Sequence, residues 1–169
     1  MNPKSTEKLM KLLKKTDFDD TFTAELLVIG LNTLSDMVDS QMQVLSVHKS
    51  TELTAMACAS QKVHGPVNAC ALLLGDMAQL RQVAETYVGV QFIETDEDAL
   101  DADCELINCI NGQFAKKFQT DEMEEEMEPP FFRGEESVIK GDAIYTVTIR
   151  LAGAKVMYGI AHNTGIEGV

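Results

Sequence analysis

One helical segment of the sequence carries the residues that could do chemistry. Four polar or small residues follow one another at intervals of four, three and four positions, which places them on one face of a helix: Asp101, Glu105, Asn108 and Gly112. The side chain of Asn108 is a carboxamide, which both accepts and donates hydrogen bonds, so it could hold a water molecule in a fixed orientation. A polar helix face is most often simply solvated, and the spacing alone leaves both interpretations open.

Two of these four residues are unfavourable inside a helix. Asn108 competes for hydrogen bonds with its own backbone, and Gly112 costs about 1 kcal/mol relative to alanine. A position without a side chain often permits the close approach of another surface. A helix that contains both residues within five positions is therefore a candidate for docking a partner.

The segment that must position them, residues 95–117, is predicted to form one continuous helix. Thr95 and Asp98 make a variant of the capping box, with aspartate where glutamate is usual. Apolar residues recur on the opposite side and predict the core stripe of this helix: Ala99, Ala102 or Asp103, Leu106, Ile107, Ile110, Phe114 and Phe118. Asp103 fits an apolar stripe poorly.

The rest of the chain contains further helix and strand patterns. Asp76 can cap a helix that Gly89 ends, and Ala152-Gly153 can make the turn of a hairpin. The predicted elements are, in order, a helix from 19 or 20 to 42, strands over 45–48 and 54–60, a turn over 61–66, a strand over 67–74, a helix over 77–88, the helix described above, and strands over 142–150 and 155–162. This order predicts an α+β fold with a mostly antiparallel sheet packed with long helices.

Length and charge limit the class of protein. A chain of 169 residues favours one domain. Its net charge of −13 argues against nucleic-acid binding, because a polyanion needs a basic surface. Residues 1–15 differ, since five lysines and one glutamate give them a charge of +4 and leave −17 for the rest. We therefore predict a basic N-terminal helical extension over 1–18, followed by the main domain over 19–169.

The basic extension is predicted to be an amphipathic helix with Leu9, Leu12 and Leu13 on one face. Such a helix can attach to a membrane surface or pack on the domain, and we favour packing. No apolar run reaches the roughly 18 to 20 residues that a membrane-spanning helix needs. The N-terminus also lacks the apolar region of a secretory signal, so a cytoplasmic protein without a membrane span is expected.

The cysteines and histidines are predicted to be structural. Four cysteines show neither a CxxC pair nor zinc-like spacing and are expected to be reduced and mostly buried: Cys58, Cys70, Cys104 and Cys109. Three histidines stand far apart, none with a second metal ligand at helical spacing: His48, His64 and His162. The sequence contains no catalytic triad pattern, P-loop or dinucleotide fingerprint, and the acidic run over 121–128 is interpreted as a solvated loop.

The pattern Asp101-x-x-x-Glu105-x-x-Asn108 resembles the signature (Asp/Ser)-x-x-x-Glu-x-x-Asn of the CheC, CheX and FliY chemotaxis phosphatases. The following Ile110 and Gly112 are also similar to the signature helix of that family. The flanking order agrees, with a glycine-bearing turn and strand and a helix ending in glycine before the signature, and a segment of prolines and glycine after it: His64-Gly65-Pro66-Val67, Gly89, Pro129-Pro130 and Gly134.

The resemblance covers about residues 20–162 and includes one signature only. The helix around Glu25 lacks the asparagine that a second signature would require. CheC-like members carry two signatures, so the chain looks more like the single-signature CheX proteins.

This resemblance implies a CheC-like fold and a phosphatase that hydrolyses the aspartyl-phosphate of a CheY-like response regulator, in bacterial chemotaxis or another two-component pathway. The regulator itself supplies Mg²⁺ and a lysine, so the phosphatase needs no cofactor of its own and mainly has to position a water molecule. Asn108 would orient that water without acting as a general base. Glu105 would pair with the regulator's lysine, and Asp101 and Gly112 would support docking.

The resemblance also implies a homodimer in which two sheets join across a two-fold axis. The C-terminal hairpin and the acidic segment after Lys117 are expected near that contact. Two alternatives stay open. One is a non-catalytic CheX-like module that docks a receiver domain. The other is a structural α+β domain in which the polar ridge formed by Asp101, Glu105, Asn108 and Gly112 is coincidental.

Overall fold

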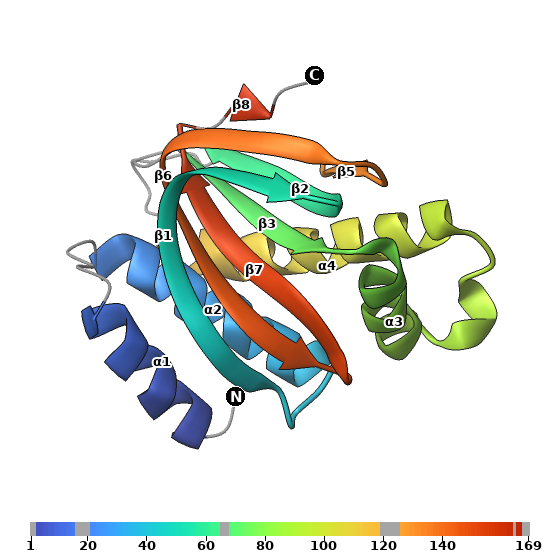
Figure 1. Cartoon of the computed structure of the whole chain (residues 1–169), viewed down its shortest axis with the longest axis horizontal. Coiled ribbons are helices and arrows are strands. Elements are labelled where there is room, and N and C mark those ends of the chain that lie inside the picture. Colours follow the sequence, from blue (N-terminus) through green and yellow to red (C-terminus); the bar gives the residue numbers. More distant parts are fainter. Residues whose placement is uncertain (1–2, 16–20, 65–67, 119–125, 164, 167–169) are drawn as a thin grey trace.

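The computed structural model describes residues 3–15, 21–64, 68–118, 126–163 and 165–166. These residues form one antiparallel sheet and a set of helices (Figure 1). The helices are α1 (Pro3–Lys15), α2 (Thr21–Met37), α3 (Met77–Val88), the short 3₁₀ helix η1 (Val90–Phe92) and α4 (Asp96–Phe118). The strands are β1 (Gln43–Ala55), β2 (Ala57–His64), β3 (Ala69–Gly75), β4 (Glu126–Met127), β5 (Phe131–Arg133), β6 (Ser137–Leu151), β7 (Ala154–His162) and β8 (Gly165–Ile166).

The sheet has the order β1-β6-β7-β3-β2-β4, with β5 also paired to β2 and β8 to β6. Figure 1 shows α2 and α4 lying along one face of it. The main core forms on that face and includes buried residues of all four α-helices. The α+β prediction with an antiparallel sheet is therefore confirmed.

A second, smaller core lies on the other face of the sheet. Among the described residues it is built from strands alone, with Cys58, Leu72 and Ile144 fully buried in it. Leu73, next to Leu72, belongs to the main core, as the alternation of side chains along a strand requires. Since β1 and β6 are strongly curved (Figure 1), we attribute the burial of this second face to the bending of the sheet.

The first long helix is shorter than predicted. It ends at Met37 instead of residue 42, because Asp39 redirects the chain. The carboxylate of Asp39 accepts hydrogen bonds from the backbone N–H groups of Gln41 and Ala152, at 2.8 and 3.0 Å. In the middle of the helix, Gly30 lets the ring of Tyr158 pack directly against the backbone, so a side chain at this position would collide with the sheet.

The prediction of short strands over 45–48 and 54–60 is wrong in its boundaries. β1 runs without interruption from Gln43 to Ala55, and only Met56 separates it from β2. Two irregularities in the pairing with β6, between Val44 and Ser46 and between Ser50 and Glu52, break the alternation that reveals a strand in the sequence. The predicted turn over 61–66 is also wrong, because β2 continues to residue 64, and residues 65–67 lie outside the described part.

The two helices that follow were predicted correctly. The N-cap of α3 is Asp76, whose carboxylate accepts from the backbone of Gln79 at 2.8 Å, and Gly89 with φ of 101° follows its last residue. At the start of α4, the backbone N–H of Thr95 donates to Asp98 Oδ2 at 2.7 Å, and the backbone N–H of Asp98 donates to Thr95 Oγ1 at 3.1 Å. Aspartate thus completes the capping box that glutamate usually makes.

The C-terminal hairpin is confirmed, but it lies in the middle of the sheet. β6 pairs with β1 and β7, and β7 pairs with β6 and β3. The turn at Ala152 and Gly153 has positive φ at both residues, 52° and 84°. Neither strand of the hairpin is an edge strand of the sheet, and the expectation that the hairpin lies near a dimer contact stays a prediction.

The basic N-terminal segment and the acidic run near residue 125 were each the subject of a prediction. Leu9 and Leu13 of α1 are buried in the main core, so this helix packs on the sheet as favoured, whereas the predicted boundary at residue 18 lies outside the described residues. The acidic run is not entirely a solvated loop, because Glu126 and Met127 form β4 and pair with the end of β2. Residues 121–125 lie outside the described part.

All four cysteines are free, and all but the half-buried Cys109 are buried. Within the described residues, every helix is too short or too polar to cross a membrane.

Candidate functional site

The polar ridge lies on α4, which is anchored in the core by its opposite side. Leu106, Ile107, Ile110 and Phe114 are buried, and the ring of Phe114 meets that of Phe22 edge to face with 5.3 Å between the centroids. On the ridge, Asp101 and Glu105 are exposed, whereas Asn108 and Gly112 are half-buried. The structure therefore brings the four predicted residues to one face of one rigid helix, and their roles stay predictions.

Asn108 is held by a second amide that the sequence analysis did not single out. The Nε2 atom of Gln61, on β2, donates to Asn108 Oδ1 at 3.0 Å. Gln61 is only 3 % exposed, so its side chain reaches from the sheet to the helix inside the protein. The hydrogen bond from Gln61 thus holds the Oδ1 atom of Asn108 toward the sheet.

Gln61 is itself held from two further sides. Its Nε2 also donates to the backbone oxygen of Glu128 at 2.9 Å, and its Oε1 accepts from Asn111 Nδ2 at 2.9 Å. Asn111 lies one turn after Asn108 on α4 and is also buried. Three side-chain amides therefore form one network that joins α4 to β2.

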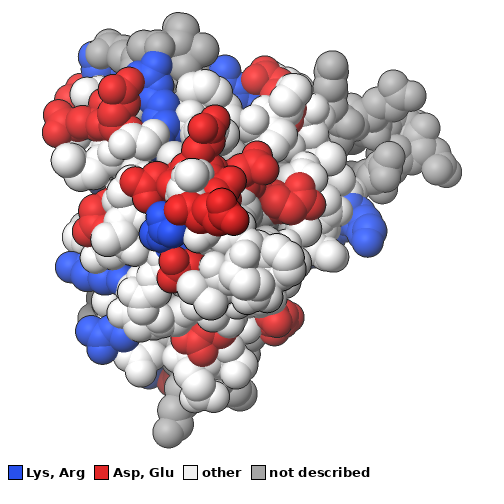
Figure 2. Space-filling view, turned by 90° about the vertical axis from the view of Figure 1, so that its right-hand side faces the viewer, with Lys and Arg blue, Asp and Glu red and all other residues white. Residues whose placement is uncertain are grey.

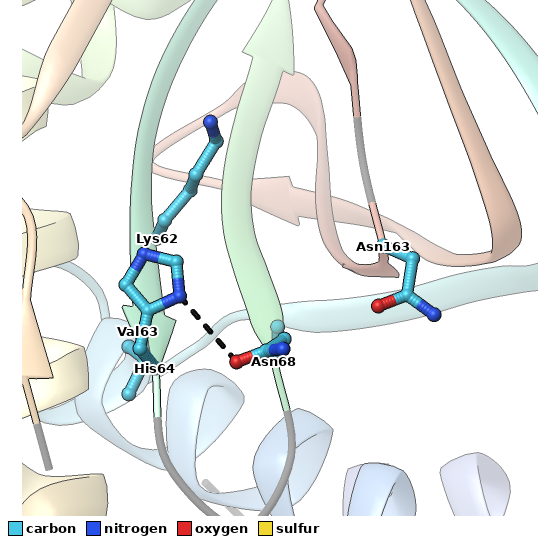
Figure 3. A pocket seen from close by; sticks show the side chains of 6 residues that line it. Lys62, Val63, His64, Asn68 and Asn163 are labelled. Atoms are coloured by element: carbon cyan, nitrogen blue, oxygen red, sulfur yellow. Dashed lines mark hydrogen bonds between the residues drawn. The ribbon is translucent and has the colours of Figure 1, made fainter.

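The segment that supplies the Glu128 carbonyl is tied to β2 by its side chain as well. Glu128 Oε1 lies 2.6 Å from Nε2 of His64, and its Oε2 lies 3.9 Å from Nζ of Lys62. The hydrogen bond from His64 is the largest influence that lowers the pKa of Glu128. Figure 3 shows the same histidine from the neighbouring pocket, where its Nδ1 faces Asn68 Oδ1 at 3.4 Å.

Glu105 is the exposed carboxylate closest in sequence to Asn108 on the ridge. The thiol of Cys109, one turn further, donates to Glu105 Oε1 at 3.9 Å, and the hydroxyl of Tyr87 lies 4.0 Å from the same sulfur. Burial raises the pKa of Tyr87 to about 12, with Cys109 and Glu105 adding to the effect. Tyr87 is therefore neutral at physiological pH, while the side chain of Glu105 lies exposed at the surface.

The two outer positions of the ridge are open. Asp101 lines a shallow hollow together with Glu97, Asp98 and Phe132. A Cβ atom built at Gly112 would meet no atom of the described residues within 4 Å. Internal packing in the described part of the chain therefore gives no reason for glycine at this position.

The ridge continues a strongly acidic surface. Four further carboxylates in the loop before α4 and its first turn are exposed: Glu94, Asp96, Glu97 and Asp98. Figure 2 shows acidic side chains gathered over this side of the molecule. Arg81 lies within the cluster but is engaged by Glu85 and Asp96, at 3.0 and 3.1 Å.

No group of three or more histidine, cysteine, aspartate or glutamate side chains in the described residues is arranged to hold a metal ion. The prediction that any Mg²⁺ belongs to the partner stays a prediction.

Gln61 and Asn111 were missed for different reasons. Gln61 was assigned to a turn, which hid that its side chain alternates toward the helix-covered face of β2. Asn111 stands within the apolar side of α4, where a buried amide needs a partner. That position was the one signal in the sequence for a polar contact beneath the ridge.

Comparisons with known proteins place this site in a family. Residues 57–153, which include the whole ridge and Gln61, match the family model described as chemotaxis phosphatase CheX. No curated protein matches the chain.

Several solved structures share the fold at low sequence identity. CheX of Desulfovibrio desulfuricans superposes with a TM-score of 0.67 and 14 % identity, covering 85 % of this chain and all of that one. CheX of Borrelia burgdorferi, solved in a complex with CheY, BeF₃ and Mg²⁺, gives 0.60 and 18 %, over 83 % and 94 % of the two chains. A CheC-like protein of Shewanella sp. PV-4 gives 0.59 and 14 %, over 88 % and 99 %. With more than half of its residues matched by the family model, and with the fold shared over 85 % of its length, this chain belongs to the CheX family.

Proposed function

We propose that the chain hydrolyses the aspartyl-phosphate of a CheY-like receiver domain. The observation that carries the proposal is the pair of the exposed Glu105 and the half-buried Asn108, which stand three positions apart on one face of α4, with the carboxamide of Asn108 hydrogen-bonded to Gln61. Membership of the CheX family supports it. So does the Borrelia burgdorferi relative, a CheX that was solved together with CheY.

The chemistry required of this chain is small. A water oxygen forms a bond to phosphorus while the bond between phosphorus and the aspartate oxygen breaks, which releases the carboxylate and inorganic phosphate. The protons of the water end on phosphate and solvent. Asn108 accepts a hydrogen bond from the attacking water and holds it in line, and it takes no proton because an amide is not a base at neutral pH. Mg²⁺ and a lysine of the receiver stabilise the charge on the phosphoryl group.

The charge of the surface favours this substrate over a free phosphate compound. The ridge and its surroundings are acidic and would repel a bare phosphate anion. A phosphoryl group that arrives with Mg²⁺ and a lysine brings the compensating charges with it. Glu105 then pairs with that lysine and sets the register of the two proteins, while Asp101 supports the docking face.

We further propose that the protein is a homodimer. β1 is the long edge strand of the sheet, and its outer side pairs with no strand of the described residues. Exposed edges of this length are usually covered, and a second copy of the sheet would cover this one. Light scattering at micromolar concentration is expected to give twice the mass of the chain, and a monomeric mass would contradict the dimer.

The direct test is to mix the protein with a panel of phosphorylated receiver domains and to time phosphate loss. We expect at least one receiver to lose its phosphate much faster with the protein than alone. Binding should be measured in parallel with the same receivers carrying BeF₃ and Mg²⁺. If a receiver binds but its rate of phosphate loss does not change, the non-catalytic docking module replaces the phosphatase.

A further inference from the structure

We infer that Gln61 is a positioning residue for Asn108, whose carboxamide it locks in one orientation. The inference rests on the proposed function, because it assigns the orientation of the group that holds the water. Gln61 lies outside the signature helix, on a strand, and it reaches the site through the protein interior.

The first step is that the orientation of the Gln61 amide is not free. The backbone oxygen of Glu128 only accepts hydrogen bonds, so the atom 2.9 Å from it has to be a nitrogen. The other end of the same amide is then an oxygen, and it meets Asn111 Nδ2 at 2.9 Å. A carbonyl on one side and an amide donor on the other therefore determine which way Gln61 faces.

The second step passes this orientation to Asn108. A primary amide has two N–H groups, and one of those of Gln61 is used by Glu128. The second points to Asn108 at 3.0 Å, and only the oxygen of Asn108 can receive it. The Oδ1 atom of Asn108 therefore faces Gln61, and its Nδ2 faces away.

The third step concerns what remains available to the substrate. An amide oxygen has two lone pairs, so Asn108 Oδ1 can accept from a water molecule while it accepts from Gln61. Rotation of a carboxamide about its last torsion is otherwise soft, and a free Asn108 would exchange donor and acceptor. A water held by Asn108 needs the acceptor in one place, which the bond from Gln61 provides.

Two variants of Gln61 test this role in different ways. Gln61→Leu removes both donors. Gln61→Glu keeps the size and the acceptor for Asn111, but it places an oxygen against Asn108 Oδ1 and the Glu128 carbonyl, so Asn108 has to turn. Loss of one such hydrogen bond corresponds to roughly a tenfold change in rate. We expect turnover at saturating receiver to fall about tenfold in Gln61→Leu and at least as far in Gln61→Glu.

Affinity and a double variant separate positioning from general damage. The affinity for the BeF₃–Mg²⁺ receiver should stay within about twofold, because Gln61 is buried and does not reach the docking face. In an Asn108→Ala background, Gln61→Leu should not lower the residual rate further, since it acts through Asn108. Thr146→Val, which removes another buried polar group from the sheet on β6, is the matched control and should leave turnover unchanged.

The orientation itself can be read by NMR from the side-chain NH₂ signals of Asn108. We expect them to be ordered in the wild type and to become mobile in Gln61→Leu. Unchanged Asn108 signals, unchanged turnover in both variants, or an equal extra loss in the Asn108→Ala background would each overturn the inference. If the wild type hydrolyses no receiver phosphate, the proposed function fails by itself, and the NMR signals still decide whether Gln61 fixes Asn108.

Discussion

Two aspartates on α4 show how differently its two faces are built. Asp101 is exposed on the polar ridge, while Asp103, only two positions later, is completely buried. Among the described residues, neither carboxylate oxygen of Asp103 has a hydrogen-bond partner, and burial raises its pKa well above the usual range. Beneath the ridge, by contrast, the buried amides of Gln61 and Asn111 are hydrogen-bonded to each other.

The contrast lies in how the polar groups of the two faces are satisfied. The inner face of α4 would be more stable without Asp103, since a buried polar group without a partner is costly. The ridge shows the reverse pattern, with polar groups that are either hydrated or aligned by the network under them. Stability of the isolated chain therefore does not explain the composition of the ridge, whereas the proposed docking of a receiver domain would explain it.

The largest effect is expected from Asn108→Ala. We expect turnover of a cognate phosphorylated receiver to fall roughly 100-fold or more, because the group that orients the water is lost. The fold should persist, since alanine is a better helix former than asparagine. Stopped-flow measurements with titrated receiver separate turnover from affinity.

Gln113→Ala is the matched control for this variant, because Gln113 is exposed on the same helix. It should retain wild-type turnover. If Asn108→Ala also retained most of it, the ridge would be a docking face without a catalytic amide.

The second effect concerns the buried face and is a matter of stability. Asp103→Leu should raise the free energy of unfolding by about 2 kcal/mol at neutral pH, because it removes a polar group without a partner. Asp103→Asn keeps the shape of the side chain but cannot ionise. Urea unfolding across a range of pH measures the free energy of unfolding of both variants.

The sign of the pH dependence follows from the raised pKa of Asp103. Above the pKa of the unfolded state, the unfolded chain has lost a proton that the folded protein retains, so the contribution of Asp103 to stability falls as pH rises. Wild type should therefore lose stability relative to Asp103→Asn as the pH rises above about 4, the pKa of an aspartate in an unfolded chain. A difference in the free energy of unfolding between wild type and Asp103→Asn that is constant with pH would contradict this account.

The third effect is expected from Glu105→Ala and should appear in binding. Loss of the proposed ion pair with the receiver's lysine should weaken affinity about tenfold and leave turnover at saturation nearly unchanged. Calorimetric titration with the BeF₃–Mg²⁺ receiver measures the affinity. Glu97→Ala removes an equal charge from the exposed first turn of the same helix and should cost about twofold, mainly through slower association. Equal losses in the two variants would assign the effect to the acidic surface as a whole.

The sequence predicted the ridge and its helix because their signals are local. The capping box at Thr95 and Asp98, the cap at Asp76 and the helical spacing of the ridge all act within a few positions. The misfit of Asp103 was also visible, because one carboxylate interrupts an otherwise apolar stripe.

The parts that were missed depend on contacts between distant segments. β1 is continuous because β6 holds it across two irregularities, and the sequence of β1 alone does not show this. Gln61 meets Asn108, 47 positions away, only because β2 lies under α4 at that register. Its third partner, Glu128, is 67 positions away. An amide network of this kind follows from the fold and not from any motif.

The smallest effect, and the one that tests the ridge most sharply, is expected from Gly112→Ala. Alanine should stabilise α4 by about 1 kcal/mol, since glycine is the weaker helix former and the new Cβ would meet no described atom within 4 Å. If a receiver covers this position, the same methyl group lies in the interface and should weaken binding severalfold. Thermal unfolding and titration with the BeF₃–Mg²⁺ receiver measure the two changes. Opposite signs, a higher melting temperature with a lower affinity, are expected from a residue selected for close approach. A variant that is more stable and binds as well as the wild type would place Gly112 outside the contact and limit the docking face to the first three residues of the ridge.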